Sequence, residues 1–158
     1  MSALMHAYVI AEDRLESADV LDLLRLHLAE MHAASPACKV HAFSPERLRG
    51  EDVTFYTVRT AERLAAVGAL KQIDATRGEL KSMRAAPDFR GKGAGAALLA
   101  HMIAEARARG LQWLGLETGR TPEFDDAHAL YRRYGFAECG AFGDYVPDEF
   151  SLCMEMKL

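Results

Sequence analysis

The segment from residue 78 to residue 110, GELKSMRAAPDFRGKGAGAALLAHMIAEARARG, constrains the fold more than any other part of the chain. Its first residues alternate as in a β-strand, and Pro87 ends this strand because proline has no N–H to continue a hydrogen-bond ladder. Apolar residues then recur at helical spacing up to Gly110, which suits a left-handed helix C-cap. The segment therefore predicts a strand, a glycine-rich turn and a helix.

The glycine-rich turn, RGKGAG at residues 90–95, is predicted to bind a phosphate group. The first N–H groups of a helix lack intrahelical partners, and glycines let an anion approach these donors closely. Arg90 and Lys92 add positive charge at the same place. The residue types and their position before a helix therefore favour a phosphate cradle.

Two common phosphate-binding motifs do not match this spacing. A P-loop has Ser or Thr after its lysine, but Lys92 is followed by Gly93, so no hydroxyl is placed to hold magnesium. A dinucleotide fingerprint, G-x-G-x-x-G directly after a strand, fits poorly, because Gly91, Gly93 and Gly95 alternate and the segment Pro87-Asp88-Phe89 intervenes. The triphosphatase interpretation fails, and dinucleotide binding stays as a weak alternative.

The rest of the chain predicts an α+β fold in which a mixed sheet is flanked by about four helices. The hydrophobic share of 50% and charged share of 27% are typical of a globular protein, and 158 residues suit a single domain. Strand 112–117 is predicted to be parallel to the strand before the glycine turn, because a helix connects the two. The other predicted elements are strands at residues 7–11, 53–59, 64–73, 136–141 and 151–157, and helices at residues 17–34, from residue 44, and at residues 122–134.

Composition excludes several classes of protein and site. No apolar run approaches eighteen residues, so we expect no membrane span. The cysteines, Cys38, Cys139 and Cys153, are odd in number and lack paired spacing, which favours reduced thiols in a cytoplasmic protein with no disulfide and no metal site. A net charge of −4 argues against a nucleic-acid partner and mildly favours a cationic one.

Three parts of the sequence together resemble the GCN5-related N-acetyltransferases, the GNAT family. Arg90, Gly93 and Gly95 match that family's cofactor motif, [RQ]-x-x-G-x-[GA], while LETG at residues 116–119 and ALYRRYGF at residues 129–136 resemble its later strand and helix. The resemblance implies acetyl-CoA as the acyl donor. It implies that the pantetheine arm pairs with the backbone of Met83 and Ala85. It also implies a set of pyrophosphate-binding residues, namely Arg90, Gly91, Lys92, Gly93, Ala94 and Gly95.

The same resemblance indicates candidate catalytic residues. Tyr131 stands where the family has its general acid, although a core aromatic residue is the alternative interpretation. Glu117 is the first candidate for the general base that removes a proton from the attacking amine, and its alternative role is that of a solvated strand end. Glu79 is the second candidate, with an alternative role as a partner of Lys81 on a solvated face. Phe124 departs from the Asn that the family commonly has at this position.

The acceptor-binding residues are the least specific of these predictions. His32 and His41 flank the loop after the first predicted helix, and Tyr145 lies in the segment between the last two predicted strands. Each is a candidate for substrate contact. His27 is predicted to be structural or solvated. The acceptor could be a protein terminus, a polyamine, an amino acid or a drug-like amine, and exposed sheet edges in such folds often pair into homodimers.

The function that the sequence predicts is transfer of an acetyl group from acetyl-CoA to a primary amine of a small molecule or peptide. Attack would be direct, within a ternary complex and without a covalent enzyme intermediate. A non-catalytic acyl-CoA-binding or regulatory domain is the alternative, but the presence of both Tyr131 and Glu117 argues against it.

Overall fold

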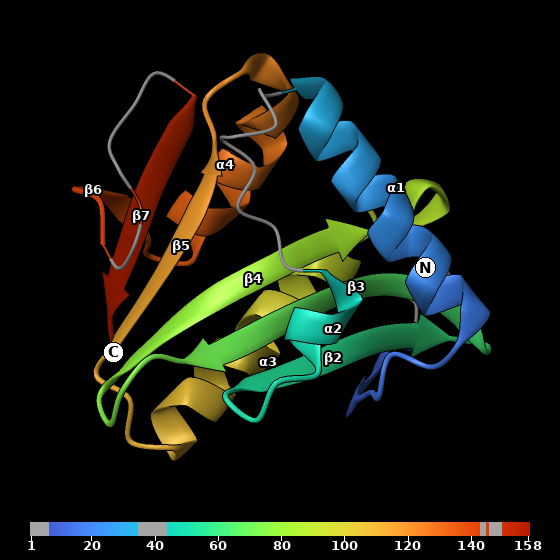
Figure 1. Ribbon diagram of the computed structural model, residues 1–158, viewed down its shortest axis with the longest axis horizontal. Helices are drawn as coiled ribbons and strands as arrows, with labels where there is room; N and C mark the ends of the chain where they lie inside the picture. The colour runs from blue at the N-terminus through green and yellow to red at the C-terminus, as the bar shows by residue number, and fades with distance from the viewer. Residues whose placement is uncertain (1–6, 35–43, 143–144, 146–149) are drawn as a thin grey trace.

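The computed structural model describes residues 7–34, 44–142, 145 and 150–158, and Figure 1 shows its arrangement. Seven strands and four α-helices account for most of this part of the chain, with two short 3-10 helices between them. In chain order the elements are β1 (Val9–Glu12), α1 (Ala18–Ala34), α2 (Pro45–Leu48), β2 (Val53–Thr60), β3 (Arg63–Gln72), β4 (Arg77–Ala85), η3 (Pro87–Phe89), α3 (Ala94–Ala108), β5 (Trp113–Gly119), η4 (Pro122–Phe124), α4 (Asp125–Arg133), β6 (Ala137–Cys139) and β7 (Ser151–Lys157).

The strands form one mixed sheet in the order β1-β2-β3-β4-β5-β7-β6. β4 and β5 are parallel, as the crossover through α3 predicts, and the other neighbouring strands are antiparallel. The predicted mixed sheet flanked by about four helices is therefore confirmed.

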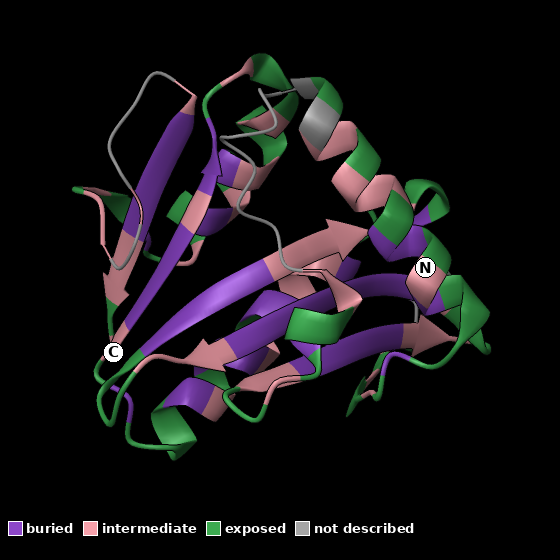
Figure 2. Ribbon diagram, in the orientation of Figure 1, coloured by how far each residue is buried: buried purple, intermediate pink, exposed green. Residues whose placement is uncertain are grey.

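Two apolar cores lie on opposite faces of this sheet, because successive side chains of a strand point to opposite sides. α3 and α4 cover one face, where Leu98 and Met102 of α3 pack with Leu80 and Leu114 of the strands. α1 and α2 cover the other face, where Leu24 packs in a second cluster. In Figure 1, α2 lies in front of the sheet and α3 behind it, and Figure 2 shows the strands between them as the most buried part.

The predicted boundaries differ from the observed ones mainly near the end of the chain. The helix predicted at residues 122–134 is divided into η4 and α4, because Phe124 adopts φ −100° and ψ 3° between them. The strand predicted at residues 136–141 is shorter, since β6 pairs with β7 over only three positions. The short helix at Ser44 is confirmed, and the Arg47 N–H donates to the Ser44 hydroxyl at 3.4 Å.

Cys139 and Cys153 are free, while Cys38 lies outside the described residues. No helix in the described ranges has both the length and the apolar character needed to cross a membrane.

The hairpin between β2 and β3 turns through Ala61 and Glu62, whose φ angles are 48° and 66°. Both residues are left-handed, a conformation that costs an L-residue about 1–2 kcal/mol and glycine very little. We predict that Glu62→Gly raises the free energy of unfolding by about 0.5–1 kcal/mol, after allowing for the extra entropy of glycine in the unfolded chain.

Urea denaturation measures this change. Glu62→Ala is the matched control, because alanine removes the same carboxylate but keeps the Cβ, and it should give no comparable gain. An equal gain from both substitutions would show that loss of the charge, not backbone relief, stabilises the protein.

Candidate active site

The candidate site lies where β4 and β5 separate. The two strands pair over four positions, the last of which joins Leu80 to Leu116. Both strands continue past these residues, β4 to Ala85 and β5 to Gly119, but no further pairs link them. Figure 1 shows β4 and β5 leaving their paired end in different directions. The divergence leaves a split in the centre of the sheet, with backbone groups of both strands along its edges.

A bulge in β4 shapes one edge of the split. Gly68 of β3 faces two residues of β4, Ser82 and Met83, at the point where the pairing register shifts. A side chain at Gly68 would collide with Leu98, because its Cβ would lie 2.9 Å from a methyl group of that residue. Ser82 has a φ of 54°, which turns the backbone out of the regular strand path. The bulge therefore re-aims the side chains of β4 at the place where the split opens.

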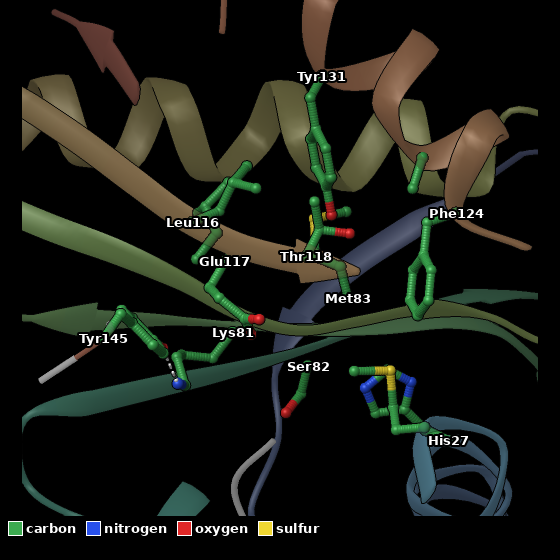
Figure 3. Close-up of a pocket in the computed structure, with 13 residues that line it drawn as sticks. His27, Lys81, Ser82, Met83, Leu116, Glu117, Thr118, Phe124, Tyr131 and Tyr145 are labelled. Carbon is green, nitrogen blue, oxygen red and sulfur yellow. Dashed lines mark hydrogen bonds between the residues drawn. The ribbon is translucent and has the colours of Figure 1, made fainter. Parts of the chain in front are cut away.

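A cavity of about 90 Å³ occupies the split. Its walls come from α1, β4, β5, η4, α4 and the excursion before β7, and Figure 3 shows the side chains that project into it. The lining residues are His27, Met31, Leu80, Lys81, Ser82, Met83, Leu116, Glu117, Thr118, Phe124, Ala127, Tyr131 and Tyr145.

Tyr131 reaches the cavity from α4, on the α3 side of the sheet. Its ring is packed edge-on against Phe136 with centroids 5.9 Å apart, and the residue is 8% exposed. In Figure 3 its hydroxyl points down toward Thr118 and Met83. Burial raises the pKa of the Tyr131 phenol to about 12, so the hydroxyl keeps its proton at neutral pH. A protonated phenol aimed into the split can act as a proton donor.

Glu117 lines the cavity from β5, and a buried charged cluster lies beside it. Lys81 Nζ is 3.4 Å from a carboxylate oxygen of Glu79 and donates to the Tyr145 hydroxyl at 2.7 Å. The Tyr145 hydroxyl in turn donates to the same Glu79 oxygen. Glu79 is 4% and Lys81 6% exposed, so the alternative interpretation of Glu79 is right about Lys81 as its partner but wrong about a solvated face. β4 instead presents this pair to the covered interior.

Burial and charge act on this cluster in opposite directions. Burial lowers the pKa of the Lys81 ammonium, while the Glu79 carboxylate partly restores it. Burial raises the pKa of Tyr145, and the negative charge of Glu79 raises it further. The hydroxyl of Tyr145 therefore stays protonated. Tyr145 was a sequence-predicted candidate, and the structure brings it to the cavity together with Glu117.

The glycine-rich turn lies at the start of α3. Gly91 and Gly93 have φ angles of 72° and 86°, and a Cβ built on either residue would meet nothing within 4 Å. The first helical hydrogen bond runs from the Ala97 N–H to the Gly93 carbonyl at 2.9 Å, so the amides of residues 94–96 precede it. The Arg90 guanidinium lies 3.4 Å from the Glu30 carboxylate of α1. Open space beside the first amides of a helix is the geometry that a phosphate requires.

The predicted residues have different positions relative to the cavity. Tyr131, Glu117, Met83 and Tyr145 line it, and Glu79 lies behind Lys81. Ala85 is at the far end of β4, where it pairs with β3. The side chain of His32 and the whole of His41 lie outside the described residues.

Three residues that line this cavity or contact it were not predicted from the sequence. Lys81 and Glu79 lie two residues apart and therefore share one face of β4. The sequence did not show that this face is buried. The position of the Ser82 side chain depends on the bulge in β4, where the register shifts. His27 was expected to be structural or solvated but lines the cavity, because α1 packs beside β4.

Phe124 lies so close to Gly119 that a Cβ on residue 119 would be 2.2 Å from the Phe124 ring. Across the described ranges, no three His, Cys, Asp or Glu residues are grouped to hold a metal ion.

Comparison with known proteins supports one family. A family model described as Acetyltransferase (GNAT) family matches residues 20–136. The uncharacterized N-acetyltransferase YsnE of Bacillus subtilis is 40% identical over 146 residues, which cover 92% of this chain and 97% of that protein. The uncharacterized N-acetyltransferase YedL of Escherichia coli is 39% identical over 151 residues, which cover 96% and 95%.

Solved structures share the same fold. An acyl-CoA N-acyltransferase from Klebsiella pneumoniae superimposes with a TM-score of 0.77 at 29% identity, covering 96% of this chain and 98% of that one. The PaiA N-acetyltransferase of Thermoplasma acidophilum, solved with coenzyme A, has a TM-score of 0.74 at 19% identity, covering 96% and 99%.

The His27 imidazole makes the stability of the folded protein depend on pH. Its pKa is lowered from 6.5 to about 4 by burial and by the positive charge of Arg84, against a smaller opposing effect of Glu30. The folded protein therefore keeps His27 neutral while the unfolded chain takes up a proton as the pH falls below 6.5. The stability that this difference contributes is complete above pH 6.5 and is lost between pH 6.5 and about 4, by about 3 kcal/mol.

We predict that His27→Gln, which cannot titrate, removes this part of the acid destabilisation. Urea unfolding at pH 7 and pH 4.5 measures it, and wild type should lose more free energy between the two pH values than the variant does. Equal losses would mean that His27 is not held neutral in the folded protein.

Proposed function

The chain belongs to the GNAT acetyltransferase family, and we propose that it transfers an acetyl group from acetyl-CoA to a primary amine within a ternary complex. The observation that carries this proposal is that Tyr131 and Glu117 line one cavity in the strand split, from α4 and β5. A proton donor and a proton acceptor beside one cavity are what acyl transfer from a thioester to an amine needs.

The proposed reaction assigns a proton to each residue. The ammonium of the acceptor must lose a proton before its nitrogen can attack, and Glu117 would accept that proton directly or through a water. The new carbon–nitrogen bond forms at the thioester carbonyl, and the carbon–sulfur bond then breaks. Tyr131 would donate its phenolic proton to the departing sulfur. Glu79 is the second candidate for the base, and its carboxylate accepts from Lys81 and Tyr145.

The glycine-rich turn fits the pyrophosphate of acetyl-CoA. Open space beside Gly91 and Gly93 leaves the amides at the start of α3 accessible, and Arg90 and Lys92 supply positive charge. The acetyl-CoA-bound GNAT structure from Elizabethkingia anophelis has the same fold, with a TM-score of 0.67 at 16% identity and coverage of 96% and 98%. The backbone of Met83 and Ala85, on the edge of β4 that leaves β5, would pair with the pantetheine arm.

The test is release of free thiol from acetyl-CoA in the presence of a panel of primary amines, measured beside calorimetric titration of acetyl-CoA alone. Amine-dependent thiol release supports the proposal. Binding of acetyl-CoA without thiol release for any amine would instead support the alternative of a non-catalytic acyl-CoA-binding or regulatory domain.

Gly93→Val is predicted to weaken acetyl-CoA affinity at least tenfold, about 1.4 kcal/mol. Gly93 has a φ of 86° and forms the N-cap of α3, so a branched side chain would distort the turn and block the approach of phosphate. Calorimetry measures the affinity, and circular dichroism checks the fold.

Gly110→Val is the matched control for this variant. Gly110 follows the other end of the same helix, has a φ of 81°, and likewise has open space around its Cβ position. The control carries similar backbone strain but should bind acetyl-CoA like wild type. If both variants lose affinity equally, general strain on α3 accounts for the effect and the turn loses its assigned role.

Tyr131→Phe is predicted to lower turnover by about 10²-fold or more, the usual contribution of a positioned acid. The phenyl ring should preserve the packing against Phe136, so folding and cofactor affinity should change little. Turnover and thermal melting on the same preparation measure both effects.

Tyr134→Phe provides the comparison, because Tyr134 ends the same helix and does not line the cavity. It should leave turnover within a few-fold of wild type. A Tyr131→Phe protein that melts early but turns over normally would make Tyr131 a packing residue only.

A further inference from the structure

Two buried polar atoms on one side of the cavity have no hydrogen-bond partner in the described part of the chain: Nδ1 of His27 on α1, and Oγ of Ser82 on β4. Both residues line the cavity, and Figure 3 shows their side chains on the side of the split away from Tyr131. Folded proteins pair nearly all buried polar groups, so two unpaired ones beside the same cavity indicate a place for a polar ligand group.

The local structure holds both groups in place. Ser82 is fixed by the bulge, where its φ of 54° turns it out of the regular path of β4. His27 is held by α1 against β4, with Arg84 close enough to disfavour its protonation. A neutral imidazole can donate from one ring nitrogen and a serine hydroxyl can also donate. The two residues can therefore present two N–H or O–H donors to one ligand group.

The charges around the cavity are distributed unevenly. On the α1 side, Arg84 and Arg90 share the Glu30 carboxylate, which leaves an excess of one positive charge. On the side of the paired strands, the carboxylates of Glu79 and Glu117 lie near the Lys81 ammonium, and Lys71 is close enough to lower the pKa of Lys81. Two carboxylates on this side and the Arg84 guanidinium on the other suit a ligand with a positive end and a negative end.

We propose that the acceptor is an amino acid, with its amine beside Glu117 and its carboxylate bound by the Ser82 hydroxyl and the His27 imidazole. This inference rests on the proposed acetyl transfer and names its substrate class. Arg84 does not line the cavity, and it contributes positive charge behind His27. Met31 and Phe124 also line the cavity, which favours an apolar side chain on the amino acid.

The pantetheine arm of the cofactor is the competing ligand for these two donors. His27 belongs to α1, which packs on the face opposite to α3, although Glu30 of α1 also contacts Arg90 of the glycine-rich turn. The experiment below separates the two.

The experiment compares amino acids with the amines that lack their carboxylate: leucine with 3-methylbutylamine, and phenylalanine with 2-phenylethylamine. Thiol release gives kcat and KM for each, and calorimetry gives the affinity of each for the protein saturated with coenzyme A. We expect the amino acid of each pair to bind at least tenfold more tightly than its amine. Equal or tighter binding of the amines would overturn the proposal.

Two variants connect the preference to these residues. Ser82→Gly removes the hydroxyl and tolerates the left-handed backbone, so the fold should survive. His27→Leu removes the hydrogen-bonding nitrogens, and His27→Gln keeps a neutral donor. Ser82→Gly and His27→Leu should each lower affinity for the amino acid at least tenfold more than affinity for the amine, because each loses a hydrogen bond to a charged group. His27→Gln should retain most of the preference.

The remaining outcomes are also decisive. Variants that weaken acetyl-CoA affinity and affect both ligands of a pair equally would assign the two donors to the cofactor arm. Variants that change nothing would assign them to bound water. Either result overturns the amino-acid proposal while amine-dependent thiol release stands. If no amine supports thiol release, the proposed function fails, and the calorimetric comparison still decides whether the cavity binds an amino acid.

Discussion

The separation of β4 from β5 after Leu80 and Leu116 is the constraint on which the candidate site depends. A continuous ladder would fill the centre of the sheet with backbone hydrogen bonds and leave no room for a ligand. The bulge opposite Gly68 and the left-handed Ser82 sustain the separation on the β4 side. Most of the sheet remains fully paired and buried, so two rigid halves hold the edges of the opening (Figure 2).

The charged side chains of Lys81 and Glu79 can be buried beside this opening because they pair with each other. Lys81 and Glu79 are almost fully buried, and an isolated charge there would be strongly destabilising. Their mutual contact and the Tyr145 hydroxyl supply compensation for this burial. Glu117 lines the cavity beside this cluster. Removing one partner would leave the other charge uncompensated, which ties the polarity of the site to the stability of the sheet.

The two faces of the sheet divide the tasks that we propose. α3 and α4 carry the glycine-rich turn and Tyr131 on one face, while α1 carries His27 and Glu30 on the other. The contacts of Glu30 with Arg84 and Arg90 connect the two sides, because Arg90 belongs to the turn. Donor and acceptor would then approach the split from opposite faces and meet between the strands.

The sequence alone determined the elements, the parallel strand pair and the turn, because hydrophobic period, proline, glycine and the crossover rule act locally. It also identified Tyr131, Glu117 and Tyr145, all of which line the cavity. Only the tertiary structure decided that Lys81 is buried and that Ser82 and His27 face the same cavity. Those facts depend on which strand face a helix covers and on one shift of register, and no local pattern of residues encodes either.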